Sequence, residues 1–587
     1  MRLADYVVER VAAAGVKHLF TVTGRGNLFL TDALARAGGL DAVCAHHEQA
    51  AAFAAAAYAQ YSGGLGACLL STGCAACNAV TGTLCAWQDC VPVLFISGNN
   101  PLRETTRHTQ TPVRTFGSQE ADIIEIVQSI TKYAVMIEDA NAIAREMDKA
   151  LYFATAGRKG PVWLDIPLDL QNARIEPAAL PRWAETGVRG PNSEALDCVL
   201  DSLGRAERPL LLLGSGVRMA GAEEAVREFA RKAALPVVSD SAAADVFAGE
   251  LFMGVAGSLG ATRAANFAVA NCDLLLSVGC ALTSVIVGPE ADKFARAARI
   301  IAVDTDRAAL GENLADCYFT ADLKMFAEAL RDADMAATGR MWQEKCRHWL
   351  EVFPRCEDIY KQSEKTDIHF LAEVLSGLLP PEAALICDAG FEQLIIPACT
   401  DFRDRRRCIQ PAAQGVMGFA LPAAAGVYFA GAGPIVVVVG DGSIMMNLQE
   451  LQTLKQHAIP AKVIIVNNSG YAVIEKRQHD LFRDRTIGTG TGDGLSFPDF
   501  AAVAECFGFR YYCAAAAGEL RERLAETLNF AGPAILEVMA VKEQKYLHSS
   551  VALNSLRRVV RRPIEDQSPF LERELFAAEM IIPPVDM

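Results

Sequence analysis

Short runs of apolar and β-branched residues recur along the whole chain, and helical stretches separate them. Continuous apolar strands of this kind are typical of parallel sheets that helices cover on both faces. We therefore predict an α/β fold built from doubly wound parallel sheets. The runs predicted as strands are ACLLST at 67–72, PVLFIS at 92–97, GPVWLDIP at 160–167, PLLLLGSG at 209–216, DLLLSVG at 273–279, ARIIAVD at 298–304, PIVVVVGDG at 434–442 and AKVIIVNN at 461–468.

The 587 residues exceed the size of one domain, and two changes in composition suggest three units. One change is the segment rich in Pro, Arg, Glu and Gly around 176–194. The other is the charged, Trp-containing helical stretch near 335–366, which we interpret as a connector. We predict domains at 1–175, 190–340 and 365–545, and a polar C-terminal tail at 546–587.

The charge balance argues against two classes of partner. With 55 basic and 70 acidic residues the net charge is −15, which opposes attraction to nucleic acid or to an anionic membrane surface. The stretches 50–88 and 408–440 carry no charge and are long enough to span a membrane. Gly63–Gly64, Pro422 and Gly431–Pro434 divide them into pieces of helix and strand size, so we expect buried core elements and no membrane span.

The cysteines indicate a reducing compartment. Seventeen is an odd number, and the N-terminus shows no apolar segment of a secretory signal, so we expect reduced thiols and a cytoplasmic protein. Cys74 and Cys77 form a CxxC pair, but neither a second pair nor histidines at ligand spacing follow nearby. We interpret this pair as structural.

The segment 440–471 carries the most informative motif. A predicted strand ends in Gly440-Asp441-Gly442-Ser443, a helix follows, and the next strand ends in Asn467-Asn468. Carboxyl ends of parallel strands face one crevice, so Asp441 and Asn468 are expected to meet there. A carboxylate, an amide oxygen and a backbone carbonyl suit Mg²⁺ that holds a diphosphate, and the start of the helix favours phosphate oxygens. Either half alone would be an ordinary turn.

This motif resembles the thiamine diphosphate (ThDP) and magnesium motif of the ThDP-dependent decarboxylases and carboligases. The resemblance implies that Asp441, Asn468 and the main-chain carbonyl of Gly470 are the metal ligands. It also implies that Gly442 and Ser443 contact the cofactor.

The same resemblance requires a glutamate early in the chain, and AHHEQAAAFAAAAYA at 45–59 supplies Glu48. In the family this residue exchanges a proton with the aminopyrimidine ring of the cofactor. We expect the alanine-rich surroundings to raise the pKa of its carboxyl by desolvation. Without the resemblance, Glu48 would be a first-turn glutamate favoured by the helix dipole.

Two further segments are assigned to the cofactor by resemblance. In QGVMGFALPAA at 414–424, Met417 would support the bent cofactor between its rings, and Gly415 would offer a backbone acceptor; alternatively Met417 is an ordinary core residue. In AGFEQ, Gly390 would lie at the diphosphate. Glu392 places a carboxylate there, which is repulsive unless it is turned away or paired.

The similarity extends over the whole chain and is closest to the acetolactate-synthase-like carboligases, especially those that transfer an acetyl group from pyruvate to a ketone or keto-sugar. Further segments that carry it are STGCAACNAVTG at 71–82, RTFGSQEADIIEIVQSITKYAV at 114–135, GRKGPVWLDIPLDL at 157–170, GLSFPDFAAVAECFG at 494–508 and RRPIEDQSPFLERELF at 561–576.

The resemblance places Gln119 among the catalytic residues and Phe116, Arg25 and Asn27 in the substrate pocket. Many relatives have Pro-Gly-Gly where this chain has Thr23-Gly24-Arg25. Arg25 could offset negative charge, grip an anionic acceptor, or be a surface arginine on a loop.

The middle unit resembles the FAD-binding unit of acetolactate synthases, with Arg158, Gly214, Gly216 and Gly257 at matching positions. Family members commonly have Gly-Xaa-Arg where this chain has Gly279-Cys280-Ala281. Because that arginine is missing, FAD binding stays open.

We therefore predict an enzyme that uses ThDP and Mg²⁺ to decarboxylate a 2-oxo acid, pyruvate above all, and to transfer the acyl group to a second carbonyl compound. The alternatives are a ThDP-dependent C–C lyase or dione hydrolase, a flavin-using oxidase, and a catalytically silent subunit with the same fold. Since Glu48 and the metal motif lie in different units, the resemblance implies a homodimer or homotetramer with active sites at the subunit interface.

Overall fold

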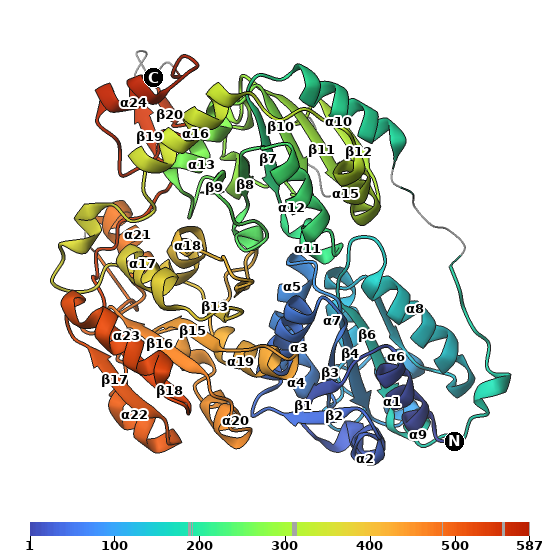
Figure 1. The fold of residues 1–587 in the computed structure, drawn as a ribbon. Coiled ribbons are helices and arrows are strands. Elements are labelled where there is room, and N and C mark those ends of the chain that lie inside the picture. The colour runs from blue at the N-terminus through green and yellow to red at the C-terminus, as the bar shows by residue number, and fades with distance from the viewer. Residues whose placement is uncertain (186–189, 191, 308–313, 484, 554–557, 586–587) are drawn as a thin grey trace.

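The computed structural model describes residues 1–185, 190, 192–307, 314–483, 485–553 and 558–585. Its core consists of three six-stranded sheets with helices packed against them (Figure 1). Every strand pair in these sheets is parallel. The predicted α/β class is therefore confirmed, and each of the predicted apolar runs overlaps a strand.

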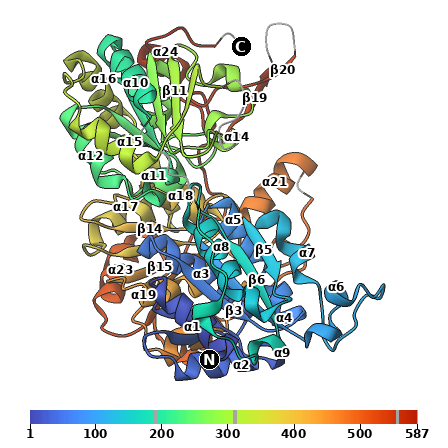
Figure 2. The ribbon, with the colours of Figure 1, turned by 90° about the vertical axis from the view of Figure 1, so that its right-hand side faces the viewer.

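The first sheet has the order β2-β1-β3-β4-β6-β5. Its strands are β1 His18–Thr21, β2 Asp41–Cys44, β3 Gly66–Leu70, β4 Val93–Asn99, β5 Tyr133–Met136 and β6 Val162–Pro167. The α-helices of this unit are α1 Leu3–Ala13, α2 Leu28–Arg36, α3 Glu48–Ser62, α4 Cys74–Asn78, α5 Val80–Gln88, α6 Thr106–Thr109, α7 Ile123–Val127, α8 Ile143–Thr155 and α9 Leu168–Gln171. Figure 2 shows that the segment around α6 projects from this unit.

The second sheet has the order β12-β11-β10-β7-β8-β9. Its strands are β7 Pro209–Leu213, β8 Val237–Ser239, β9 Phe252–Val255, β10 Leu274–Val278, β11 Arg299–Asp304 and β12 Cys317–Thr320. Its helices include α10 Ser193–Arg205, α11 Ser215–Met219, α12 Glu223–Lys232, α13 Arg263–Asn271, α14 Ser284–Val287, α15 Leu323–Asp332 and α16 Arg340–Val352. The stretch interpreted as a connector contains α16, whose Trp342 and Trp349 are buried in the core of this unit.

The third sheet has the order β14-β13-β15-β16-β18-β17. Its strands are β13 Ala384–Cys387, β14 Arg407–Ile409, β15 Ile435–Gly440, β16 Lys462–Asn467, β17 Arg510–Ala514 and β18 Ala534–Met539. Its helices include α17 Ile368–Leu378, α18 Phe391–Cys399, α19 Ala420–Phe429, α20 Glu450–Gln456, α21 Ala472–Phe482, α22 Phe500–Phe507 and α23 Leu520–Asn529.

The C-terminal segment returns to the second unit, as Figure 1 shows. It contains β19 Val551–Leu553, β20 Val559–Arg561 and α24 Arg573–Glu579. Asn266 donates a hydrogen bond to the carbonyl of Ile564 (2.8 Å), and Phe576 packs into the core beside α13. The segment predicted as a polar tail thus buries part of its apolar surface. The predicted domain boundaries stay predictions, and part of the seam at 176–194 lies outside the described residues.

The two charge-free stretches are divided as predicted. The first forms most of α3 together with β3, α4 and α5, and the second contains α19 and β15. Within the part of the chain that the structure describes, no helix is both long and apolar enough to cross a membrane.

Close packing of α3 against α19 joins the first and third units. Residues 50–60 of α3 are all buried. A Cβ at Gly426 would lie 2.2 Å from the carbonyl oxygen of Ala54, so the two backbones approach as closely as only small residues allow. The rings of Phe53 and Phe419 meet edge to face at 5.6 Å. The alanine-rich sequence that looked like a possible membrane span is therefore a helix–helix contact inside the chain.

Arg407 joins all three units. Its guanidinium donates to the carbonyls of Gln60 and Tyr61 (3.0 and 3.1 Å) in the first unit and forms an ion pair with buried Asp245 of the second (3.0 Å). Arg218 also pairs with Asp245 (3.0 Å). Although burial opposes ionisation, the two arginines hold the pKa of Asp245 below its ordinary value.

We expect Arg407→Ala to lower the stability of the protein by about 2–3 kcal/mol. This value is at the low end for a broken buried ion pair, because Arg218 continues to neutralise Asp245. The check is the apparent Tm, which should fall by several degrees. Arg405→Ala is the matched control, because that neighbouring arginine is 84% exposed and pairs only with surface Glu382. Equal Tm values for both variants would contradict the role of Arg407.

Candidate active site

Four adjacent strands of the third sheet bring the predicted cofactor residues to one edge. In the order β14-β13-β15-β16, their carboxyl ends lead to segments 411–418, 388–392, 441–443 and 468–470. Ligands of open parallel sheets bind outside this edge. The topology therefore gathers segments that are far apart in the sequence.

Asp441 and Asn468 follow neighbouring strands and are both buried. The Asp441 carboxylate accepts hydrogen bonds from the backbone N–H of Gly442 (2.7 Å) and of Gly470 (3.2 Å). The side-chain oxygen of Asn468 is buried and has no hydrogen-bond partner among the residues that the structure describes. An unpartnered buried oxygen beside a carboxylate is a donor set that a hard cation would satisfy.

The predicted cofactor glycines lie where a side chain would not fit. A Cβ at Gly442 would lie 2.1 Å from the ring of Tyr471, and one at Gly390 would lie 2.3 Å from the Glu392 carboxylate. Gly415 has φ +60°, and its N–H donates to the carbonyl of Pro411 (2.8 Å).

Ser443 precedes a short helical turn but does not cap it through its side chain. Its hydroxyl instead accepts a hydrogen bond from the N–H of Gly418 (3.2 Å), and this bond links the motif to the segment that carries Met417. Met417 is half-buried, so it is not an ordinary core residue in the single chain.

Three buried carboxyl groups meet at this edge. Burial raises the pKa of Asp388 and of Asp441 to about 6. It raises the pKa of Glu392 to about 8, and the charges of Asp441 and Asp388 add to the rise. Glu392 is therefore neither exposed nor paired with a cation among the described residues, and it remains protonated near neutral pH. A protonated carboxyl does not repel a diphosphate.

The first sheet presents a second edge built in the same way. In the order β2-β1-β3-β4, the carboxyl ends of its strands lead to Glu48, to the loop 23–27, to α4 and to the loop that carries Gln119. The parallel strand order therefore places these candidate residues at one edge of the first sheet.

Glu48 begins α3 and is half-buried. It does have a polar neighbour, because the Asn78 amide donates a hydrogen bond to its carboxylate (2.9 Å). The next residue, Gln49, accepts a hydrogen bond from Asn447 of the third unit (3.1 Å). Within the described residues of one chain, however, no hydrogen bond joins Glu48 itself to Asp441, Ser443 or Asn468.

Helix α4 connects Glu48 to the Gln119 loop. Asn78 at its end binds Glu48, and a Cβ at Gly73 before its start would lie 1.6 Å from the carbonyl oxygen of Gln119. Gln119 has φ +59°, and its side chain is exposed. Phe116 is 50% exposed.

The loop after β1 separates its two predicted pocket residues. Arg25 is exposed, whereas Asn27 is fully buried and bonded to its own loop, accepting from the N–H of Gly24 (3.0 Å). Asn27 therefore shapes the loop, and its predicted contact with substrate has no support from this geometry.

A cleft of about 320 Å³ lies at the carboxyl ends of β7, β10 and β11, where all three units meet. Arg158 and Gly216 line it; Gly214 and Gly257 are not among the lining residues. A Cβ at Gly214 would lie 2.2 Å from the carbonyl oxygen of Gly279, so this glycine permits close backbone packing. Asp304, at the end of β11, has a buried oxygen that accepts no hydrogen bond, and Arg158 lies 3.9 Å from it.

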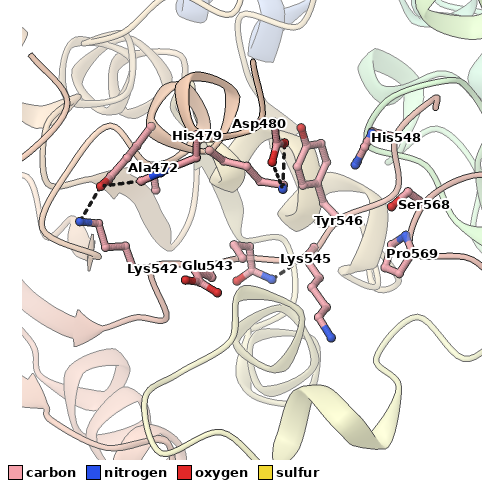
Figure 3. Close-up of a pocket in the computed structure, with 13 residues that line it drawn as sticks. Ala472, His479, Asp480, Lys542, Glu543, Lys545, Tyr546, His548, Ser568 and Pro569 are labelled. Carbon is pink, nitrogen blue, oxygen red and sulfur yellow. Dashed lines mark hydrogen bonds and ion pairs between the residues drawn. The ribbon is translucent and has the colours of Figure 1, made fainter. Parts of the chain in front are cut away.

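A larger cavity of about 570 Å³ lies beside α21, the helix that follows segment 468–470 (Figure 3). It is bounded by α21, the segment 542–548 and Ser568–Pro569. Two ion pairs form between residues that line it: Lys542–Glu475 (2.7 Å) and Lys476–Asp480 (3.1 Å). Figure 3 shows Lys545 extending away from these pairs. The sequence carried no readable signal for this cavity.

Two residues of the site were missed. Asp388 accepts hydrogen bonds from the N–H groups of Ala389, Gly418 and Ala420, and an aspartate directly after a predicted strand could have indicated it. Asn78 had no signal of its own, because its role depends on how α4 packs beside α3. Among the described residues there is no cluster of three or more His, Cys, Asp or Glu side chains that could hold a metal; the predicted set contains a single carboxylate.

Comparison with known proteins defines the class. Residues 1–121, 196–330 and 388–538 match, in turn, the N-terminal TPP binding domain, the central domain and the C-terminal TPP binding domain of the thiamine pyrophosphate enzymes. The protein is thus a ThDP-dependent enzyme of three α/β units.

Full-length relatives define the family within that class. The chain is 32% identical to a probable acetolactate synthase 2, chloroplastic, of Oryza sativa subsp. japonica, over 93% of this chain and 84% of the relative. It is 31% identical to an acetolactate synthase of Arthrospira platensis (92% and 94%) and 30% identical to an acetolactate synthase large subunit of Haemophilus influenzae (93% and 95%). The chain belongs to the acetolactate-synthase-like family of ThDP-dependent carboligases, as the sequence motifs predicted.

We expect Glu392→Gln to remove part of the pH dependence of stability in the cofactor-free protein. In the parent, the unfolded chain ionises Glu392 above its ordinary pKa of 4.5, whereas the folded protein keeps it protonated up to about pH 8. Stability is therefore lost as pH rises through this window, with each unit of pKa difference worth about 1.4 kcal/mol.

The Tm of the variant relative to the parent should rise between pH 5 and pH 8 in thermal unfolding. Glu382→Gln, at an exposed carboxylate, is the control and should show no such trend. A parallel pH profile for parent and Glu392→Gln would disprove the assignment.

Proposed function

We propose that the protein decarboxylates pyruvate and transfers the resulting acetyl group to a second carbonyl compound, with Mg²⁺ anchoring ThDP. The observation that carries this proposal is the pair formed by Asp441 and the unpartnered buried oxygen of Asn468 at the carboxyl edge of the third sheet. The relatives named acetolactate synthase support the substrate class. When bound, ThDP supplies the electron sink that lets a 2-oxo acid lose carbon dioxide and pass its acyl group on.

The residues present fit a magnesium ion. Asp441, Asn468 and the carbonyl of Gly470 would provide hard oxygen ligands, and diphosphate oxygens or water would complete an octahedron. The dication would also offset the negative charge of the Asp388 and Asp441 carboxylates there, while the protonated Glu392 adds none. Gly390, Gly442 and Ser443 would contact the diphosphate, and Gly415 and Met417 would hold the rings.

Glu48 would hold and return a proton at the aminopyrimidine nitrogen. The Asn78 amide keeps its carboxylate oriented, and α4 keeps the Gln119 loop at a set position relative to it. Gln119 would then donate a hydrogen bond to the reacting carbonyl, with Phe116 beside it.

We further propose that a second copy of the chain completes each active site, in a homodimer or homotetramer. In one chain, Glu48 makes no hydrogen bond to the metal motif among the described residues, and apolar side chains around that motif are exposed. Met446, Leu481 and Phe482 are 47%, 71% and 50% exposed, which is costly unless another surface covers them. We also propose a cytoplasmic location.

For the central cleft we propose a dinucleotide ligand, with FAD as the candidate. The buried Asp304 carboxylate, whose Oδ2 lies 3.9 Å from Arg158, suits a ribose hydroxyl, and Arg158 with Lys159 would face the phosphates. Cys280 and Ala281 line the position where relatives carry an arginine, so Arg158 would have to provide more of the positive charge that faces the phosphates. The absorbance spectrum of the purified protein tests this part.

The overall test is incubation with ThDP, Mg²⁺ and pyruvate, followed by measurement of carbon dioxide release and of new C–C bonds in the product. Absence of carbon dioxide at saturating cofactor would refute the proposed activity.

We expect Glu48→Gln to slow carbon dioxide release by about 10²- to 10⁴-fold, because an amide cannot exchange the proton. Uptake of ThDP with Mg²⁺, measured by calorimetry, should change little. Glu207→Gln is the control, since Glu207 is 85% exposed on a turn outside the site. A Glu48→Gln variant as active as the parent would indicate that this carboxylate takes no part in the reaction.

We expect Asn468→Ala to weaken Mg²⁺-dependent ThDP uptake at least about tenfold, because the ion loses one of its few ligands from the chain and water has to take that position. Excess chelator should abolish uptake by the parent. Asn529→Ala, an exposed position at the end of α23, serves as the control. Unchanged uptake by Asn468→Ala in calorimetry would exclude Asn468 as a ligand.

A further inference from the structure

We propose that Arg25 binds an anionic group of the acceptor substrate, a phosphate or a carboxylate that stays on the molecule throughout the reaction. This inference rests on the proposed function and adds a residue that determines its acceptor specificity. Three features carry it: the fixed backbone of the loop around Arg25, the absence of a partner for its guanidinium among the described residues, and its position at the edge that carries the candidate catalytic groups.

Hydrogen bonds to two neighbouring segments fix the backbone of the loop that presents Arg25. The N–H of Gly26 donates to the Ser71 hydroxyl (3.1 Å), and the Gln171 amide donates to the carbonyl of Gly26 (2.6 Å). Buried Asn27 closes the loop by accepting from the N–H of Gly24 (3.0 Å). Arg25 is therefore an exposed side chain on a backbone that is well fixed.

Close packing explains why glycines flank Arg25. A Cβ at Gly26 would lie 1.8 Å from the Thr72 hydroxyl, and one at Gly24 would lie 2.3 Å from the Ser71 hydroxyl. The loop consequently lies directly on the segment that leads into α4. The position of Arg25 is thereby tied to the helix whose Asn78 binds Glu48.

The guanidinium of Arg25 makes no ion pair or hydrogen bond within the described parts of the chain. Two other arginines, which follow β4, do have carboxylate partners: Arg107 pairs with Asp122 (2.8 Å), and Arg103 lies 3.8 Å from Glu104. An arginine without a carboxylate partner is available to bind an anion, because its forked donors match carboxylate and phosphate oxygens.

The position of Arg25 in the sheet points toward the reaction site. It follows β1, which lies between β2 and β3, the strands that lead to Glu48 and α4; Gln119 follows the next strand, β4. A group bound by Arg25 would therefore lie at the same edge as the proposed catalytic residues.

The charge belongs to the acceptor for a physical reason. The donor carboxylate leaves as carbon dioxide, so a strong ion pair with it would stabilise the ground state and slow that step. An anionic group on the acceptor persists, and binding it does not have this cost. The net charge of −15 also repels anionic molecules at long range, so a local cation is needed to bind one.

The experiment uses the ThDP- and Mg²⁺-loaded enzyme with pyruvate as donor and two acceptor pairs: dihydroxyacetone phosphate against dihydroxyacetone, and 2-oxobutanoate against butanone. For each acceptor, kcat/KM for transfer, or the inhibition constant against carbon dioxide release, is measured in the parent, Arg25→Gln and Arg25→Lys. The phosphate pair and the carboxylate pair show which anion the site prefers.

We expect the parent to favour the anionic member of at least one pair, and Arg25→Gln to lose about 10- to 100-fold for that member and less than about twofold for its neutral partner. Arg25→Lys should recover part of the loss. The parent's preference should also weaken as ionic strength rises. The matched control is Lys17→Gln, an exposed cation that precedes β1 at the opposite edge of the sheet, and it should leave all constants unchanged.

Carbon dioxide release from pyruvate alone separates the two proposals. If the parent releases none, the proposed function fails, whatever Arg25 does. If release is normal but the parent does not distinguish anionic from neutral acceptors, or Arg25→Gln loses equally for both, the assignment of Arg25 is overturned while the function stands.

Discussion

The architecture depends on the close approach of α3 and α19. These helices consist largely of alanine and other small residues, so their backbones come within contact distance and exclude water along their length. The contact sets the first sheet against the third and brings Gln49 to Asn447. The start of α3, where Glu48 lies, is thereby anchored to the unit that carries the metal motif. A larger side chain at Gly426 would meet the backbone of Ala54 and push the two units apart.

The first and third units position their candidate residues in the same way. In each sheet, four adjacent parallel strands end at one edge, and the candidate residues follow those ends. The edge of the first sheet carries Glu48, Arg25 and Gln119, and the edge of the third sheet carries Asp441 and Asn468. We propose the first for proton transfer and for anion binding. The third concentrates buried carboxyl groups whose raised pKa values show how strongly that environment disfavours uncompensated negative charge. The proposed dication would relieve this cost, so under that proposal metal binding and cofactor binding would be coupled there.

The central unit has a structural role that its sequence only partly indicated. Arg407 of the third unit binds Asp245 of the central unit and two carbonyls of the first, and the C-terminal segment packs back onto α13. The cleft where the three units meet is lined by residues of each. A ligand in this cleft would contact Ala412 and Ala413, which lie just before Gly415 and Met417. The central cleft and the proposed cofactor site therefore adjoin along the same segment of backbone.

Much of this protein follows from local sequence. Apolar runs such as PIVVVV and KVIIV can only be buried strands, and their alternation with helices dictates parallel sheets; Asp441 and Asn468, placed directly after such strands, must lie at one edge because parallel strands share a direction. Other properties depend on groups that meet only after folding. Asn78 reaches Glu48 because α4 packs beside α3, and Glu392 stays protonated because the third unit buries it near two aspartates. Asn27 bonds within its own loop, whereas Arg25 has no partner in the described parts of the chain. Local sequence determines which segments are strands and where each strand ends, because strand formation depends on neighbouring residues. Side-chain partners and burial depend on contacts between distant segments, so only the tertiary structure decides them.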